Sequence, residues 1–175
     1  AASALPSAED IAHRLAQAEG ADRISGLHAL LVSQGDRLLF EHYGKGDDES
    51  EIGGALHDVV FGPDVPHDLR SVSKSVVGLV YGIALAAGKV PPPEAKLYDQ
   101  FPEYADLARQ PGRDRITIHH VLSMTLGIEW DELTVPYGRD LRNSEIAMEA
   151  APERFRFILE RPIIAEPGTK WSYCG

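Results

Sequence analysis

The chain has 175 residues, and 17 basic against 27 acidic side chains give it a net charge of −10 at neutral pH. Its 43% apolar and 7% aromatic residues are typical of a globular protein with a sizeable core, and they exclude disorder and fibrous structure. The acidic balance, without a cluster of Lys and Arg, argues against nucleic acid and anionic membranes as partners. The longest apolar run, residues 76–88, is shorter than the about 20 residues that a membrane span needs.

The single cysteine, Cys174, excludes an internal disulfide and a zinc site built from several cysteines. The chain begins Ala-Ala-Ser-Ala without a methionine, which fits the mature end left by a signal peptide. Export to the periplasm or the medium is therefore one expectation, and a cytoplasmic location stays open. The chain stops at residues 171–175, directly after a Pro-Gly turn signal, so we expect a truncated C-terminal end. The oligomeric state stays open.

Helix and strand signals alternate in the N-terminal part. Ser7, followed by Asp10 and a periodic apolar run, predicts a capped helix with Gly20 just beyond its end. Apolar runs at residues 27–33 and 37–43 around a Gln-Gly-Asp turn predict a β-hairpin that packs on this helix. Two further elements are expected here, a surface loop rich in glycine and acidic residues and a short strand, at residues 44–54 and 56–61.

A long helix is predicted from Ser71 to about Ala87, ending at Gly88 before three prolines. It is apolar nearly all round, which predicts a central helix covered on more than one side. From Pro91 onward strand signals vanish, and Thr117 is a predicted N-cap. Short helices are predicted there, at residues 95–101, 118–124, 143–150 and 153–159.

These elements predict an α+β fold, in which an antiparallel sheet flanked by helices lies beside a helical lobe. Residues 1–90 are predicted to form the N-terminal part of the sheet lobe, including the helix that begins at Ser71. Residues 91–165 are the predicted helical lobe. Residues 166–175 are predicted to start a further motif, and we expect the rest of the sheet lobe to be missing after them.

The chemistry begins at Ser71-Val72-Ser73-Lys74. Ser71 and Lys74 are three residues apart, so on a helix their Cβ atoms lie about 5–6 Å from each other and an amine can reach a hydroxyl. A serine at a helix start also lies beside free N–H groups, which favour oxyanion character. The same spacing arises by chance in many chains, and such a serine is often only an N-cap.

Tyr173, near the end of the chain, is the second candidate. A phenol beside an ammonium group can accept a proton, so a Tyr–Lys pair can replace the histidine of a catalytic triad. On its own, Tyr173 fits better as a half-buried aromatic residue on an extended segment. The two signals together predict a catalytic serine more strongly than either does alone.

Five stretches of the chain, in family order, resemble the serine β-lactamase and penicillin-binding protein superfamily. The likeness is greatest to its class C β-lactamase-like branch, which includes the family VIII esterases and the nylon-oligomer (aminohexanoate-dimer) hydrolases. The stretches are residues 38–43 (LLFEHY), 67–75 (HDLRSVSKS), 101–104 (FPEY), 116–131 (ITIHHVLSMTLGIEWD) and the PGT…Y stretch at 167–173.

The resemblance implies the β-lactamase/D-alanyl peptidase-like fold. It also implies that Ser71 is the acylated nucleophile, that Lys74 assists proton transfer and that Tyr173 is the general base. The third position of the tyrosine motif is Gly175 instead of Asn, which resembles the esterase and amide-hydrolase branches and removes an amide that would hold a β-lactam side chain. The family's Lys/His-x-Gly strand is absent from these residues.

Gly175, Trp130 and Cys174 are candidates for the wall of a substrate pocket. Cys174 fits better as a small buried residue than as a reactive thiol. Asp131 and Glu132 fit a solvated turn better than a pocket wall.

The resulting hypothesis is a serine hydrolase that forms an acyl-enzyme with a small ester or amide. A β-lactamase or D-alanyl-D-alanine peptidase is the alternative within the enzymes. A non-catalytic penicillin-recognising module, or an inert fragment, is the alternative of another class. No cofactor and no metal are implied, because His119 and His120 point about 100° apart on a helix and have no partner at i+4.

Overall fold

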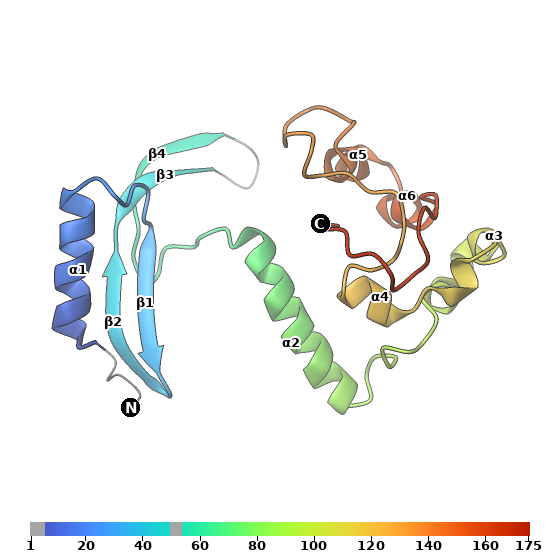
Figure 1. The fold of residues 1–175 in the computed structure, drawn as a ribbon, viewed down its shortest axis with the longest axis horizontal. Coiled ribbons are helices and arrows are strands. Elements are labelled where there is room, and N and C mark those ends of the chain that lie inside the picture. Colours follow the sequence, from blue (N-terminus) through green and yellow to red (C-terminus); the bar gives the residue numbers. More distant parts are fainter. Residues whose placement is uncertain (1–5, 50–53) are drawn as a thin grey trace. The chain divides into compact units, whose positions relative to one another are not determined.

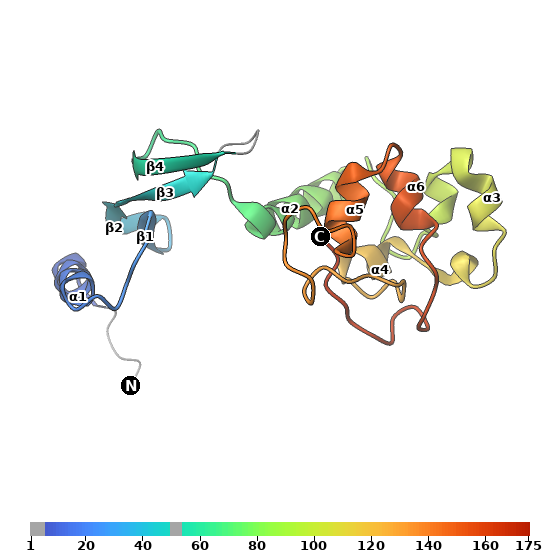
Figure 2. The same ribbon diagram turned by 90° about the horizontal axis from the view of Figure 1, so that it is seen from above.

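The computed structural model describes residues 6–49 and 54–175 of the chain. The chain divides into two compact units, Ala1–Asp68 and Leu69–Gly175, and Figures 1 and 2 show the elements of each. The domain boundaries predicted at residues 90 and 165 stay predictions. In the described part of the chain, no helix has the length and apolar character needed to cross a membrane.

The first helix, α1 (Ala8–Gly20), begins at the predicted capping box. The Ser7 hydroxyl accepts the N–H of Asp10 at 3.1 Å, and the Ser7 N–H donates to the Asp10 carboxylate at 3.1 Å. This pair satisfies two N–H groups that a helix start leaves free. The prediction for the other end is wrong, because Gly20 is the last helical residue and the left-handed conformation falls on Asp22, at φ 52°.

The predicted hairpin is confirmed. Strands β1 (Ala29–Gln34) and β2 (Arg37–Tyr43) pair antiparallel with Gln34 opposite Arg37, so Gly35 and Asp36 form the two-residue turn. Gly35 has φ 55°, which a glycine adopts without steric cost. Strand β2 contacts α1 as expected (Figure 1).

The prediction of a surface loop after the hairpin is wrong for β3 (Lys45–Glu49), which pairs with β4 (Ala55–Val60). Charged residues fit this small sheet because their side chains pair with each other across the strands. Lys45 Nζ lies 2.8 Å from the Asp58 carboxylate, and His57 Nδ1 lies 3.2 Å from that of Asp47. Strand β4 confirms the predicted short strand, and residues 50–53 of the predicted loop lie outside the described residues.

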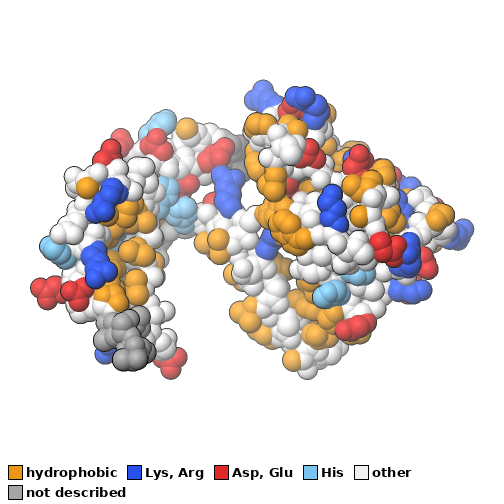
Figure 3. All heavy atoms as spheres, viewed as in Figure 1, with side chains coloured by type: hydrophobic (Ala, Val, Ile, Leu, Met, Phe, Trp, Pro, Cys, Tyr) orange, Lys and Arg blue, Asp and Glu red, His pale blue; other side chains and the backbone are white. Residues whose placement is uncertain are grey.

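The second unit begins with a 3₁₀ turn, η1 (Arg70–Val72), that leads into α2 (Ser73–Ala86). The long predicted helix is thus confirmed, although its α-helical part starts two residues late. Val77, Leu79 and Ile83 are 63%, 66% and 62% exposed, so the cover predicted for more than one side of this helix is not found within this unit. Figure 3 shows hydrophobic side chains along this helix.

Short helices and turns make up the rest of this unit. The helices predicted at 118–124, 143–150 and 153–159 are confirmed to within about two residues, whereas the one predicted at 95–101 is only a 3₁₀ turn. The elements are η2 (Tyr98–Gln100), η3 (Pro102–Tyr104), α3 (Ala105–Ala108), η4 (Arg113–Arg115), α4 (Ile118–Leu122), α5 (Ser144–Ala150) and α6 (Arg154–Leu159).

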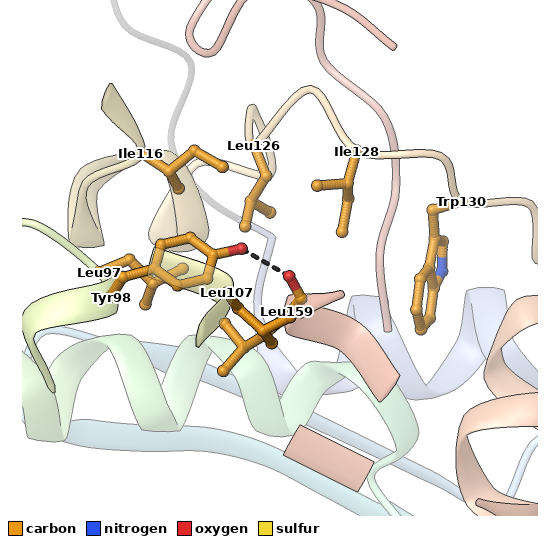
Figure 4. Close-up of a cluster of buried hydrophobic side chains, with 8 residues drawn as sticks. All are labelled: Leu97, Tyr98, Leu107, Ile116, Leu126, Ile128, Trp130 and Leu159. Atoms are coloured by element: carbon orange, nitrogen blue, oxygen red, sulfur yellow. Dashed lines mark hydrogen bonds between the residues drawn. The ribbon is translucent and has the colours of Figure 1, made fainter. Parts of the chain in front are cut away.

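A cluster of buried apolar side chains forms the core of this unit (Figure 4). Its members are Leu97, Tyr98, Leu107, Ile116, Leu126, Ile128, Trp130 and Leu159. A buried arginine, Arg113, completes it at the end of α6. Its guanidinium donates to the Tyr98 hydroxyl at 2.7 Å and to the carbonyls of Leu159, Glu160 and Arg161. The arginine thereby satisfies carbonyl groups that the last turn of α6 leaves free.

Candidate active site

The predicted nucleophile, Ser71, lies in the 3₁₀ turn η1 and not at the N-cap of an α-helix. The residue before it, Arg70, is left-handed with φ 46°. Such a conformation costs a non-glycine residue about 1–3 kcal/mol, and strain of this kind gathers at functional sites. The turn leaves the Ser71 side chain exposed at the start of α2.

Ser71, Lys74 and Tyr173 are brought together by the fold, although Tyr173 is 102 positions away in sequence from the serine. Lys74 Nζ donates to Ser71 Oγ at 3.2 Å, and the Tyr173 hydroxyl forms a hydrogen bond with the same Oγ. The ammonium also lies 5.5 Å from the centre of the Tyr173 ring. One hydroxyl is therefore in contact with two groups that can take up or return its proton.

The segment that carries Tyr173 is held by the loop after α4. Ser172 N–H donates to the Met124 carbonyl at 3.0 Å, and Gly168 N–H donates to the Thr125 carbonyl at 2.8 Å. Gly127 lets the two segments approach closely, because a Cβ there would lie 2.3 Å from the Ala165 carbonyl oxygen. These contacts fix the direction from which the phenol reaches the serine.

One comparison with known proteins gave a match. A family model described as Beta-lactamase matches residues 11–175 of the chain. The chain belongs to the Beta-lactamase family. The searches of the curated proteins and of the solved structures gave no match. Membership supports a hydrolase of the serine type, and the roles of the three residues in catalysis stay a prediction.

The predicted pocket residues of this Beta-lactamase-family domain differ in exposure. Trp130 is only 8% exposed and is part of the core, with its ring against Phe157. Cys174 packs against the same core, and Gly175 is exposed and bonded through its N–H. Trp130 and Cys174 thus lie behind the site, and their contribution to a substrate pocket stays a prediction.

The interpretation of Glu132 as part of a solvated turn is wrong, since this residue is 3% exposed. Its carboxylate accepts hydrogen bonds from Trp130 Nε1 at 2.5 Å, from the Tyr137 hydroxyl at 2.6 Å and from Gly175 N–H at 2.5 Å. The neighbouring Asp131 does lie in an exposed turn, where it accepts the Thr134 N–H.

A signal for the burial of Glu132 is present in the sequence. Every second residue before it is apolar and buried, namely Leu126, Ile128 and Trp130. A period of two is typical of an extended segment with one buried face. Continued by one step, the pattern places Glu132 on that buried face.

Two acidic side chains dominate the electrostatics behind Tyr173. Burial raises the pKa of Glu145, and the charge of Glu132 adds to this effect, whereas Lys74 opposes it. Burial, together with the same two carboxylates, raises the pKa of the Cys174 thiol to about 12. The hydrogen bond to Glu132 raises the pKa of Tyr137 to about 12. The two carboxylates therefore lie close to each other and to Cys174.

The histidines of α4 have a structural explanation. His120 Nδ1 accepts the Thr117 N–H at 3.1 Å and completes a capping box, and His119 is exposed beside it. Within residues 6–49 and 54–175, the structure holds no group of three or more His, Cys, Asp or Glu side chains able to bind a metal ion.

Proposed function

We propose that this Beta-lactamase-family protein is a serine hydrolase that forms an acyl-enzyme with a small ester or amide. In this proposal Ser71 is the nucleophile, and Lys74 and Tyr173 transfer its proton. The observation that carries the proposal is the pair of hydrogen bonds that Ser71 Oγ makes with Lys74 Nζ and the Tyr173 hydroxyl.

The proposed reaction has two steps. Ser71 Oγ forms a bond with the carbonyl carbon of the substrate while its proton passes to the Tyr173–Lys74 pair. The bond to the leaving group then breaks, and the alcohol or amine leaves with that proton. In the second step water attacks the acyl-enzyme, the pair takes a proton from the water and returns it to Ser71 Oγ, and the acid is released.

Gly175 is the reason for preferring a small ester or amide over a β-lactam. It stands at the third position of the tyrosine motif, where Asn is the residue that holds a β-lactam side chain. Without that amide, a bulky acylamino group loses a hydrogen-bond partner, and a small acyl group loses nothing. The class C-like, family VIII type of enzyme is thus the branch that we propose.

Covalent labelling tests the nucleophile. We expect a fluorophosphonate to add to Ser71 of the protein, as located by mass spectrometry of its peptides, and S71A to abolish both this adduct and the hydrolysis of a short-chain 4-nitrophenyl ester. S75A is the matched control, because Ser75 lies on the same exposed stretch, and it should label like the wild type. An adduct on Ser73 or Ser75, or none at all, would contradict the proposal.

A substrate panel tests the substrate class. We expect kcat/KM to be higher for short-chain esters and anilides than for a chromogenic cephalosporin. Faster turnover of the cephalosporin would favour the β-lactamase alternative while leaving the Ser71 chemistry intact. Binding of all three without turnover or labelling would favour a sensor module.

A further inference from the structure

The place of the third side chain in the tyrosine motif is filled by two carboxylates. A Cβ on Gly175 would lie 2.8 Å from Glu132 Oε1, 2.9 Å from Glu132 Oε2 and 2.8 Å from Glu145 Oε2. These distances are below any ordinary contact between a carbon and an oxygen atom, so a side chain at this position requires the carboxylates to move.

The Glu132 carboxylate is not free to move away. Glu132 is buried and accepts three hydrogen bonds, including the one from Gly175 N–H. Asn143 holds the elements that carry both glutamates, because its side-chain NH₂ donates to the Glu132 carbonyl at 3.1 Å and its Oδ1 accepts the Glu145 N–H at 3.0 Å. Asn143 is itself fully buried. The two elements that carry Glu132 and Glu145 are thus held together at Asn143, and the two carboxylates form one wall beside Gly175.

The bond from Gly175 N–H to Glu132 also acts on Tyr173. Two residues of extended chain span about 7 Å, so this bond anchors the segment close to the phenol that contacts Ser71 Oγ. On its other side the segment is held at Ser172, whose N–H donates to the Met124 carbonyl. Tyr173 therefore lies between two backbone anchors, one of which is Glu132.

The charge of the wall distinguishes it from an amide. All three groups that contact the Glu132 carboxylate are donors, which suits an ionised carboxylate. Glu145 Oε2 is buried without a hydrogen-bond partner in the described structure. A substrate whose acyl group approaches Gly175 therefore meets a negative wall, where Asn would offer a neutral one.

We propose that Glu132 and Glu145 form a specificity-determining wall that favours neutral or cationic acyl groups over anionic ones, and that Glu132 is also a positioning residue for Tyr173. This inference rests on the proposed function, because it assigns the substrate class of the same site.

Three 4-nitrophenyl esters test the charge preference. Their acyl chains have equal length and end in a methyl, a trimethylammonium or a carboxylate group. For the wild type we expect kcat/KM to be about tenfold higher with the cationic ester than with the anionic one, because a negative charge attracts the first and repels the second. In E132Q and E145Q the cation-to-anion ratio should fall at least about fivefold.

The positioning role is separated from the charge by two substitutions of one residue. E132Q keeps an oxygen for Gly175 N–H, so kcat for the neutral ester should stay within threefold of the wild type. E132A removes the anchor, and kcat should fall more than tenfold while KM changes little. The matched control is E129Q, which removes a carboxylate paired with Arg161 outside the site and should change neither kcat nor the ratio.

A substitution at Gly175 tests the same contact from the other side. G175A should lower kcat more than tenfold because its Cβ displaces the carboxylates, and the double variant G175A/E132A should be no worse than E132A alone, since both changes act on one contact. Additive losses would overturn the positioning role.

The outcomes separate the two proposals. Without a fluorophosphonate adduct on Ser71 of the wild type, the proposed function falls and the wall falls with it. With that adduct present, an unchanged cation-to-anion ratio in E132Q and E145Q overturns the wall alone, and equal kcat in E132A and E132Q overturns the positioning role alone.

Discussion

Two regions of the second unit are similarly rich in apolar residues, but one exposes their side chains and the other buries them. Along α2, side chains such as Val77, Leu79 and Ile83 are more than 60% exposed, whereas the core members Leu107 and Ile116 are 2% and 0% exposed. The candidate site joins these regions. Ser71 and Lys74 come from the exposed helix and the turn before it, and Tyr173 comes from a segment bonded to the packed region.

The difference indicates which region fixes the geometry of the candidate active site. Tyr173 is anchored through Ser172 and Gly175 to residues of the loop that includes core members. The serine and the lysine are set only by the local turn and one turn of helix. The packed region should therefore control stability, while the contact between the two regions should control activity.

The largest expected effect comes from breaking that contact. K74A and Y173F should each lower kcat for a short-chain ester by about a thousandfold or more, and the double variant should be no more than about tenfold worse, because members of one catalytic unit are not additive. Steady-state kinetics, with folding checked by circular dichroism, measures this. Losses that add in free energy would mean that the lysine and the tyrosine act independently.

Cys174 tests the packed side of the Tyr173 segment. Because burial raises the pKa of its thiol to about 12, little reactive thiolate is present at pH 8. Alkylation by iodoacetamide should be at least about a hundredfold slower in the folded protein than in urea, as followed by intact mass. Equal rates in the two states would show that this segment is open in solution.

Removing Arg113 should destabilise the packed region more than any surface change. R113A leaves the carbonyls at the end of α6 without their donor in a buried place, and we expect a loss of about 3–5 kcal/mol in the free energy of unfolding. Urea denaturation followed by the fluorescence of the buried Trp130 measures it. The exposed Arg109 is the control, and R109A should change stability by less than about 0.5 kcal/mol.

Ile116 tests core packing without polar groups. The side chain is fully buried, so I116A removes apolar contacts and leaves a cavity, at a cost of about 3 kcal/mol. The same denaturation experiment applies. A loss below about 1 kcal/mol would mean that the core collapses around the smaller residue.

Local signals predicted most of the elements. The caps at Ser7 and Thr117 define where helices begin because a cap is formed within a few residues, and the structure has both. The hairpin follows from two apolar runs and a turn in the same way. The strand β3 was missed because its Gly- and Asp-rich residues have low strand propensity and pair only through β4.

The three residues of the candidate site were predicted from the sequence, whereas the residues around them were not. Ser71 and Lys74 are three residues apart, so a helical pattern predicts their contact, whereas no local pattern predicts the contact with Tyr173, which was expected from the chemistry of a Tyr–Lys pair and from the family resemblance. Glu132 and Glu145 were missed because their position depends on Asn143 and on the path of the Gly175 segment. Such contacts between distant segments have no local signal beyond the alternation that ends at Glu132.

The smallest expected effect is that of a substitution on α2, and it tests the difference between the exposed helix and the packed core most directly. Val80 is 56% exposed, so V80A removes little buried surface, and alanine has a higher helix propensity than valine by about 0.5 kcal/mol. The two effects nearly cancel, and the free energy of unfolding should change by less than about 0.5 kcal/mol, against the about 3 kcal/mol expected for I116A. A loss above about 1 kcal/mol in V80A would contradict this and would mean that this face of α2 is covered in solution, because only burial makes the loss of two methyl groups that costly.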